Sequence, residues 1–212
     1  MSRLIFALFI LTFASLLGAQ DIMESPVTEE TRPRVNGIFS ELASHELMRA
    51  DYTQAKYIAA LDRELPGSGV FLFHGERGMA WMVEKPFPME LVINDRELIQ
   101  RSRSGQSQTL SFEENPSFHG FSQTVQAIFR GDYDEVDRQY EIFFDSEGEG
   151  WEMALVPRDS SVKALIASFV LKGETDLEEF VINESTGDRI TYQFFNISYP
   201  EQFSDGENRV LP

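Results

Sequence analysis

The side chains best suited to chemistry are three histidines and a serine, and their spacing argues against a catalytic or metal site. His45, His74 and His119 lie far apart and lack the H-x-x-x-H spacing that places two imidazoles on one metal ion. The chain also has no cysteine to complete such a site. Ser68 stands between Gly67 and Gly69, which is not the G-x-S-x-G motif of serine hydrolases. We therefore expect no catalytic residue, no metal ligand and no cofactor.

Two acidic segments offer carboxylates for cation binding or acid–base chemistry. Asp145 begins the stretch Asp-Ser-Glu-Gly-Glu-Gly, which resembles the start of a calcium loop, but the twelfth position of that loop would be Val156 instead of glutamate. A hairpin turn explains this stretch better. The second segment is the acidic run at 132–137. With 35 Asp and Glu in the chain, chance pairs of carboxylates are expected, so a hydrolase based on such a pair ranks last among our hypotheses.

Aromatic and apolar side chains that recur with strand or helix periodicity carry the main signal. They would form a broad lining of phenylalanine, tryptophan and methionine, adaptable enough to accept acyl chains. The same alternation also fits an ordinary packed core, because it indicates which side chains point inward and not whether the interior is empty. The candidate lining residues are Phe71, Phe73, Met79, Trp81, Phe118, Phe121, Val125, Ile128, Phe129, Trp151, Met153, Phe169, Tyr192 and Phe194.

The N-terminal segment has the features of a secretory signal. Arg3 supplies a positive charge, Leu4 to Leu17 are almost wholly apolar, and Gly18-Ala19-Gln20 offers small residues to a signal peptidase. We predict cleavage after Ala19, which makes residues 1–19 the signal peptide, 20–33 a flexible leader and 34–212 one folded domain. We expect the mature chain in the periplasm, because a core of this size needs no disulfide.

The elements that would position the lining residues are mostly strands. The periodicity predicts an amphipathic helix from Arg34 to about Ser44 and a second helix that starts at Asn115-Pro116 and ends at Gly131. Turn residues at 66–69, 75–78 and 94–95 separate the first strands. This order favours a mainly β fold with helices (α+β), in which one curved antiparallel sheet holds both helices against one face. The predicted strands are 52–61, 69–74, 79–84, 89–94, a pair around Leu98 and Leu110, 139–144, 151–156, 164–171, 179–183 and 190–198.

The charge of the chain excludes several kinds of partner. There are 18 Lys and Arg against 35 Asp and Glu, so the net charge is −17. Such a field repels phosphate backbones and anionic head groups, so we expect neither nucleic acid nor a membrane surface as a stable partner. The apolar N-terminal run is about 14 residues, shorter than the roughly 20 of a membrane span, so we expect no stable membrane insertion. A basic face on a protein partner would be attracted.

From Val35 to Ile197 the chain resembles a divergent branch of the outer-membrane lipoprotein carrier (LolA-like) family. No single motif is sharp, and the resemblance rests on the order and spacing of several. They include an aromatic-Thr-Gln first strand, a glycine-rich hairpin with a tryptophan strand, and a Lys-Pro turn. The segments that carry the resemblance are 48–54, 69–73, 78–81, 85–87, 131–132, 151–157 and 187–189.

This resemblance implies a half-open β-barrel with a helical lid and a monomeric carrier. In the family the apolar cavity receives acyl chains from an inner-membrane exporter, of ABC type or RND type, and passes them to an outer-membrane acceptor. One departure is clear. The family has a Phe-Arg-Trp strand after the Lys-Pro turn, whose arginine hydrogen-bonds the lid, and residues 86–94 of this chain hold no arginine. The family's closing contact therefore cannot be carried over.

Two hypotheses of different class remain. The first is a periplasmic carrier for lipoproteins or lipids, and the second is a packed interaction module whose acidic surface docks a protein partner. The absence of a nucleophile, an oxyanion hole or a metal cluster in the sequence pattern argues against an enzyme.

Overall fold

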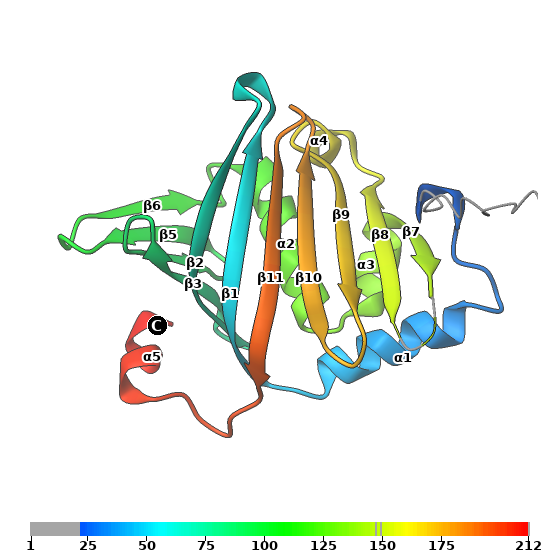
Figure 1. Ribbon diagram of the computed structural model, residues 1–212, viewed down its shortest axis with the longest axis horizontal. Helices are drawn as coiled ribbons and strands as arrows, with labels where there is room; N and C mark the ends of the chain where they lie inside the picture. Colours follow the sequence, from blue (N-terminus) through cyan, green and yellow to red (C-terminus); the bar gives the residue numbers. More distant parts are fainter. Residues whose placement is uncertain (1–21, 147, 149, 212) are drawn as a thin grey trace, which may run out of the picture.

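The computed structural model describes residues 22–146, 148 and 150–211, so the predicted signal peptide and part of the turn near residue 148 lie outside the described residues. Among these residues, eleven antiparallel strands form one sheet that is not closed, in the order β6-β5-β4-β3-β2-β1-β11-β10-β9-β8-β7 (Figure 1). The predicted fold class is therefore confirmed. The strands are β1 (Leu47–Ile58), β2 (Arg63–His74), β3 (Gly78–Lys85), β4 (Met89–Ile93), β5 (Glu97–Ser102), β6 (Ser107–Ser111), β7 (Tyr140–Asp145), β8 (Trp151–Pro157), β9 (Ile166–Gly173), β10 (Leu177–Glu184) and β11 (Arg189–Ser198).

The long hairpin of β1 and β2 differs from the prediction. Its turn is the short 3-10 helix η2 (Ala59–Leu61) followed by Asp62, whose φ of 45° is left-handed. The strand break predicted at 66–69 is wrong, because these residues lie inside β2 and pair with β1. The register with β3 shifts between Ser68 and Gly69. Glycine beside a bulge lets a strand bend, so these residues mark a bend in β2 and not its beginning.

The two predicted helices are present and a third packs beside them. The helices α1 (Arg32–Ala43) and α2 (Pro116–Phe129) match the sequence prediction to within two residues at each end. Figure 1 shows α2 behind the central strands, on one side of the sheet. The acidic run begins the unpredicted helix α3 (Tyr133–Gln139), where the Asp132 side chain accepts a hydrogen bond of 3.1 Å from the Glu135 N–H. In the described part of the chain no helix is long and apolar enough to cross a membrane.

Part of the expected leader is bound to the sheet. After the 3-10 helix η1 (Ile22–Glu24), the Val27 N–H donates to the Ile142 carbonyl at 3.1 Å, and the Phe144 N–H donates to the Ser25 carbonyl at 2.8 Å. Residues 25–27 of the predicted leader therefore pair with β7. Covering the outer edge of β7 satisfies backbone groups that an edge strand would otherwise leave unpaired.

The sheet has two apolar faces, each with its own cover. We call the face toward α2 the inner face and the opposite one the outer face. On the outer face, Leu72, Ala80 and Val92 pack with Phe203 and Leu211 of the C-terminal segment, which contains α5 (Asp205–Val210). Apolar residues alternate on both faces of β2 to β4, so this part of the sheet needs a cover on each side. The short helix α4 (Ser160–Lys163) lies at the start of β9.

Candidate functional site

The candidate site is the contact between α2 and the inner face of the sheet. Phe129, at the end of α2, lies in the middle of a group of aromatic rings. Its ring centroid is 4.8 Å from that of Phe71, 5.9 Å from that of Phe73 and 6.0 Å from that of Phe180. Phe194 of β11 lies 5.2 Å from Phe71 and 6.1 Å from Phe129. Rings at these separations attract one another beyond simple area burial, so α2 and strands from both halves of the sheet share one aromatic cluster.

Nearly all predicted lining residues lie in this aromatic cluster. All of them except Phe118 and Phe121 belong to one set of buried side chains on the inner face. Phe121 is half-buried and packs against the cluster, with its ring 6.0 Å from that of Phe169. Phe118 is 41% exposed. Residues 118–121 of α2 are more exposed than those in the second half of the helix.

Two central members of the cluster, Phe180 and Tyr52, are not among the predicted lining residues. Phe180 is fully buried, and its ring stacks 5.8 Å from that of Phe169. Its alternation with Ile182 on a predicted strand was the available signal. Tyr52 is 1% exposed and contacts Tyr192 at 5.6 Å between ring centroids. The predicted strand begins at this residue. Met48 and Ala50, which precede it, alternate on the same buried face and were the signal for a longer strand.

Three buried polar side chains of α2 lie within the protein, and two of them contact the sheet and the turn after β4. Ser122, Thr124 and Gln126 are at most 2% exposed. The hydroxyl groups of Thr124 and Tyr140 are 2.5 Å apart, and Gln126 Nε2 donates to the Asn94 carbonyl at 3.2 Å. Because buried polar groups need partners, these contacts fix the rotation of α2 as well as its position. The helix is therefore anchored both by the hydroxyl group of a core tyrosine and by the turn after β4.

Arg130 closes the C-terminal end of α2 onto two turns of the sheet. Its Nε donates to the Gly75 carbonyl at 2.8 Å, in the turn between β2 and β3. Its Nη2 donates to Asp95 Oδ1 at 3.1 Å, in the turn between β4 and β5, and to Gln126 Oε1 at 2.9 Å. This chain lacks the family arginine on the strand after the Lys-Pro turn. Here an arginine at the end of the helix itself joins helix and sheet.

The tyrosines of the site stay neutral. Burial raises the pKa of Tyr140 to about 12, against a smaller lowering by the hydrogen bond with Thr124. The pKa of Tyr52 is raised by burial and then by the negative charge of Glu84. Burial also raises the pKa of Tyr192. A phenol with a raised pKa is a poor general base near pH 7, so these groups act as neutral hydrogen-bonding groups.

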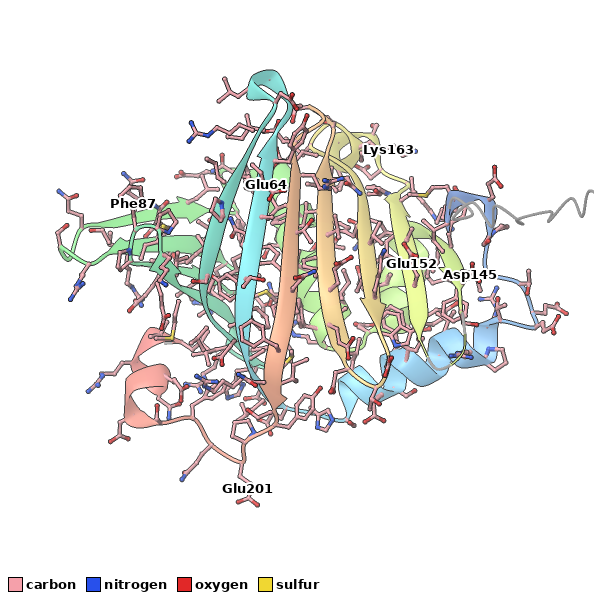
Figure 2. All side chains as sticks on the ribbon, in the orientation of Figure 1. Glu64, Phe87, Asp145, Glu152, Lys163 and Glu201 are labelled. Atoms are coloured by element: carbon pink, nitrogen blue, oxygen red, sulfur yellow. The ribbon has the colours of Figure 1, made fainter. Side chains whose placement is uncertain are left out.

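The described residues contain no group of three or more His, Cys, Asp or Glu side chains placed to hold a metal ion. The carboxylates that the sequence offers are spread over the surface instead. On the outer face, for example, Lys172 pairs with Glu152 at 3.3 Å and with Glu179 at 3.7 Å. Figure 2 labels Glu152 on β8 and Glu64 on β2, which lie in opposite halves of the sheet. The chemistry that the site offers is therefore binding of apolar groups.

The chain is similar to several solved structures at low sequence identity. Among solved structures, a LolA superfamily protein from Nitrosomonas europaea is 11% identical, with a TM-score of 0.47, over 84% of this chain and 97% of that one. A DUF1329 family protein from Desulfovibrio piger is 9% identical, with a TM-score of 0.48, over 89% of this chain and 100% of that one. No curated protein matches the sequence.

The sequence model of one family matches the chain directly. That family is described as outer membrane lipoprotein carrier protein LolA, and the match covers residues 43–207. The matched region runs from the end of α1 through all eleven strands into α5, and so includes the aromatic cluster and the helix that covers it. Since it spans most of the chain, the protein belongs to the LolA family of outer membrane lipoprotein carrier proteins.

Proposed function

We propose that this protein binds the acyl chains of a lipoprotein or lipid between α2 and the inner face of the sheet, and carries them across the periplasm. The observation that carries the proposal is the aromatic cluster under a single helix. Its members are flat rings and methionines, which can rearrange around ligands of varied shape. Membership of a family of lipoprotein carriers supports the same conclusion.

Loading requires α2 to move away from the sheet. Phe129 contacts rings of β2, β10 and β11, so an acyl chain must displace this side chain to reach the inner face. The helix begins at Pro116 and is followed by Gly131, whose φ is 66°. Both residues break helices, so α2 is a unit with its own ends, able to swing without unravelling its neighbours. The hydrogen bonds that Arg130, Gln126 and Thr124 make to the sheet and its turns must be released in this movement.

The route that we propose rests on the signal-like N-terminus and on what the family resemblance implies for donor and acceptor. After export and cleavage the protein would receive its cargo from an inner-membrane exporter of ABC or RND type and deliver it to an outer-membrane acceptor. The net charge of −17 favours partners with a basic docking face. The protein would act as a monomeric carrier by binding and release, without a catalytic step.

The second candidate, a packed interaction module without cargo, is favoured by one observation. The inner-face rings already fill the space that cargo would take: Phe71 is fully buried and Phe194 is 5% exposed. In a module of this kind α2 would be a permanent part of the core. The acidic surface would then be the functional one.

Two measurements distinguish the candidates. Mass spectrometry of protein purified from its native periplasm should find co-purified acyl lipid or lipoprotein. Titration of the delipidated protein with an environment-sensitive apolar dye should show a saturable site with one-to-one stoichiometry. Folded, monomeric protein that carries no lipid and binds no dye would exclude the carrier and leave the packed module.

Neighbouring residues on β11 supply a matched control. Phe194 lies in the aromatic cluster, whereas Phe195 is 46% exposed on the outer face. We expect Phe194→Ala to weaken dye binding at least fivefold in the folded fraction, because it removes a ring from the binding surface. Phe195→Ala should bind like the wild type. Equal effects of the two substitutions would place the dye outside the aromatic cluster.

A further inference from the structure

Two buried hydrogen-bond donors in the aromatic cluster have no acceptor among the described residues. They are the hydroxyl group of Tyr52 and the Nε1–H of Trp81. Tyr52 is 1% exposed and Trp81 is 4% exposed. A buried donor without an acceptor is destabilising, because it has given up its hydrogen bonds to water and gained none in return. Natural proteins keep few such groups, so two in one cluster indicate that a ligand supplies the missing acceptors.

The two donors belong to the same part of the site. Tyr52 of β1 pairs with Gly69 of β2, and a Cβ on this glycine would lie 3.1 Å from the Tyr52 hydroxyl oxygen. The hydroxyl group therefore lies close to the backbone of β2 at Gly69, where the Met82 carbonyl oxygen of β3 also approaches, 2.1 Å from the same Cβ position. Trp81 of β3 pairs with Phe71, two residues further along β2 and on the same face. Both donors' rings contact Tyr192, at 5.6 Å and 5.9 Å between centroids.

Comparable side chains elsewhere in the chain have partners. The indole N–H of Trp151 donates to the Glu174 carbonyl at 2.9 Å. The Tyr199 hydroxyl group donates to Asp176 at 2.5 Å. The third buried atom without a partner is Arg77 Nε, but the Arg77 guanidinium donates through its other nitrogens to the C-terminal segment. Side chains whose polar groups are wholly unpaired thus coincide with the proposed acyl site.

The surroundings define the acceptor that these donors need. Hydrocarbon offers no acceptor, so the tail of an acyl chain leaves both donors unpaired. The side chains around them are apolar, and the negative charge of Glu84 acts on Tyr52, so a carboxylate would be both desolvated and repelled. A neutral carbonyl oxygen has the lone pairs that the donors lack and no charge to neutralise.

We propose that Tyr52 and Trp81 donate hydrogen bonds to the ester or amide carbonyl oxygens at the head of the bound acyl chains. The inference rests on the proposed acyl-binding function and names its ligand class: lipids whose chains are joined through a neutral carbonyl group. The donors are unpaired in the closed protein and paired in the loaded one. Part of the binding free energy therefore comes from relieving a destabilising feature of the empty site.

The test compares lipids that differ only in this carbonyl group. Dipalmitoylglycerol has ester-linked chains, and dihexadecylglycerol has ether-linked chains of the same length. Each would displace the apolar dye from the delipidated protein. We expect the wild type to bind the ester lipid about tenfold more tightly than the ether lipid, as one or two hydrogen bonds predict. Tyr52→Phe and Trp81→Phe should each reduce this ratio at least twofold. Tyr52→Phe, which keeps the ring, should do so without weakening ether-lipid binding.

A stability measurement and a control complete the test. Tyr52→Phe removes an unpaired hydroxyl group, so the urea midpoint of the empty protein should stay the same or rise. The control Tyr199→Phe removes a paired hydroxyl group outside the site, so its midpoint should fall while the ester-to-ether ratio keeps its wild-type value. Equal binding of both lipids by the wild type, or an unchanged ratio in both site variants, would overturn the inference alone. Failure to bind either lipid would overturn the acyl-binding function and the inference with it.

Discussion

Replacing Arg130 by methionine tests whether α2 opens as a unit. Methionine keeps much of the length and apolar surface of arginine but cannot donate. The variant loses the hydrogen bonds to the Gly75 carbonyl, at 2.8 Å, and to Gln126, at 2.9 Å, and the ion pair with Asp95, at 3.1 Å. The two hydrogen bonds contribute about 1 kcal/mol each. The Arg130 and Asp95 side chains are 34% and 65% exposed, so solvent screening leaves the ion pair a few tenths of a kcal/mol at most.

The bond to Gln126 lies within α2 and persists when the helix opens. The closed state is therefore weakened by about 1 kcal/mol through the lost bond to Gly75, which is a factor of about 5 in the opening equilibrium. If opening precedes binding and the open form is a minor species, the apparent affinity and the association rate for the apolar dye should rise by about this factor. Stopped-flow fluorescence at several dye concentrations measures both. The urea midpoint should fall at the same time, because the closed, folded state has lost these contacts.

The matched control is Arg138→Met on α3. Arg138 is 67% exposed and pairs with Glu135 of the same helix, so its loss should change neither the dye kinetics nor the midpoint appreciably. The decisive comparison is between stability and kinetics. If Arg130→Met lowers the midpoint but associates with dye at the wild-type rate, α2 does not open independently and the reasoning fails.

Three further substitutions have distinct expected outcomes. Phe121→Asp should abolish dye binding with little change in the urea midpoint, because the half-buried side chain can turn to water when the helix moves. Global unfolding of this variant would instead indicate a rigid core. Gly131→Ala should lower the free energy of unfolding by more than about 1 kcal/mol, since φ is 66° and the added Cβ would lie 2.1 Å from the Phe39 carbonyl oxygen. An unchanged urea midpoint would contradict this close approach. The pKa of Tyr140 rises from 10.0 to about 12 on folding, so the unfolded chain loses this proton first, and stability should fall between these pH values by up to about 1.4 kcal/mol per pH unit. Tyr140→Phe should remove that part of the alkaline loss, and an identical pH profile in urea melts would show that Tyr140 does not contribute.

The antiparallel sheet was predictable because most of its pairs are consecutive hairpins. Turns such as the one at 75–78 join strands that follow each other in the sequence, so neighbours along the chain became neighbours in the sheet. The pairing of β1 with β11 joins residues from opposite ends of the domain, and no local pattern specifies it. The bend at 66–69 shows the limit of turn chemistry. Proline and glycine there signal irregular backbone, and only the long register with β1 shows that the strand continues.

The aromatic cluster was also predictable in large part, because alternation identifies the inward face of a strand. Alternation does not show how much of α2 packs closely against the inner face of the sheet. Phe118 and Phe121 share the helical face of Val125, yet burial falls off toward the start of α2. The helices α3 and α5 are seven and six residues long, too short for a periodic signal. The contacts of Arg130 depend on two turns distant in sequence, so they required the folded structure.

The two covers of the β2 to β4 region are held by different means. The outer cover is fastened through its backbone: Arg77 donates to the Leu211 carbonyl at 3.1 Å, and Arg101 donates to the Val210 carbonyl at 3.1 Å. Its apolar side chains belong to a compact cluster with Leu72. The inner cover, α2, is held by side-chain hydrogen bonds of Thr124, Gln126 and Arg130, and lies over a cluster that contains two unpaired donors. Free energy can be recovered by ligand binding beneath the inner cover, and for this reason the inner cover is the one that we expect to open.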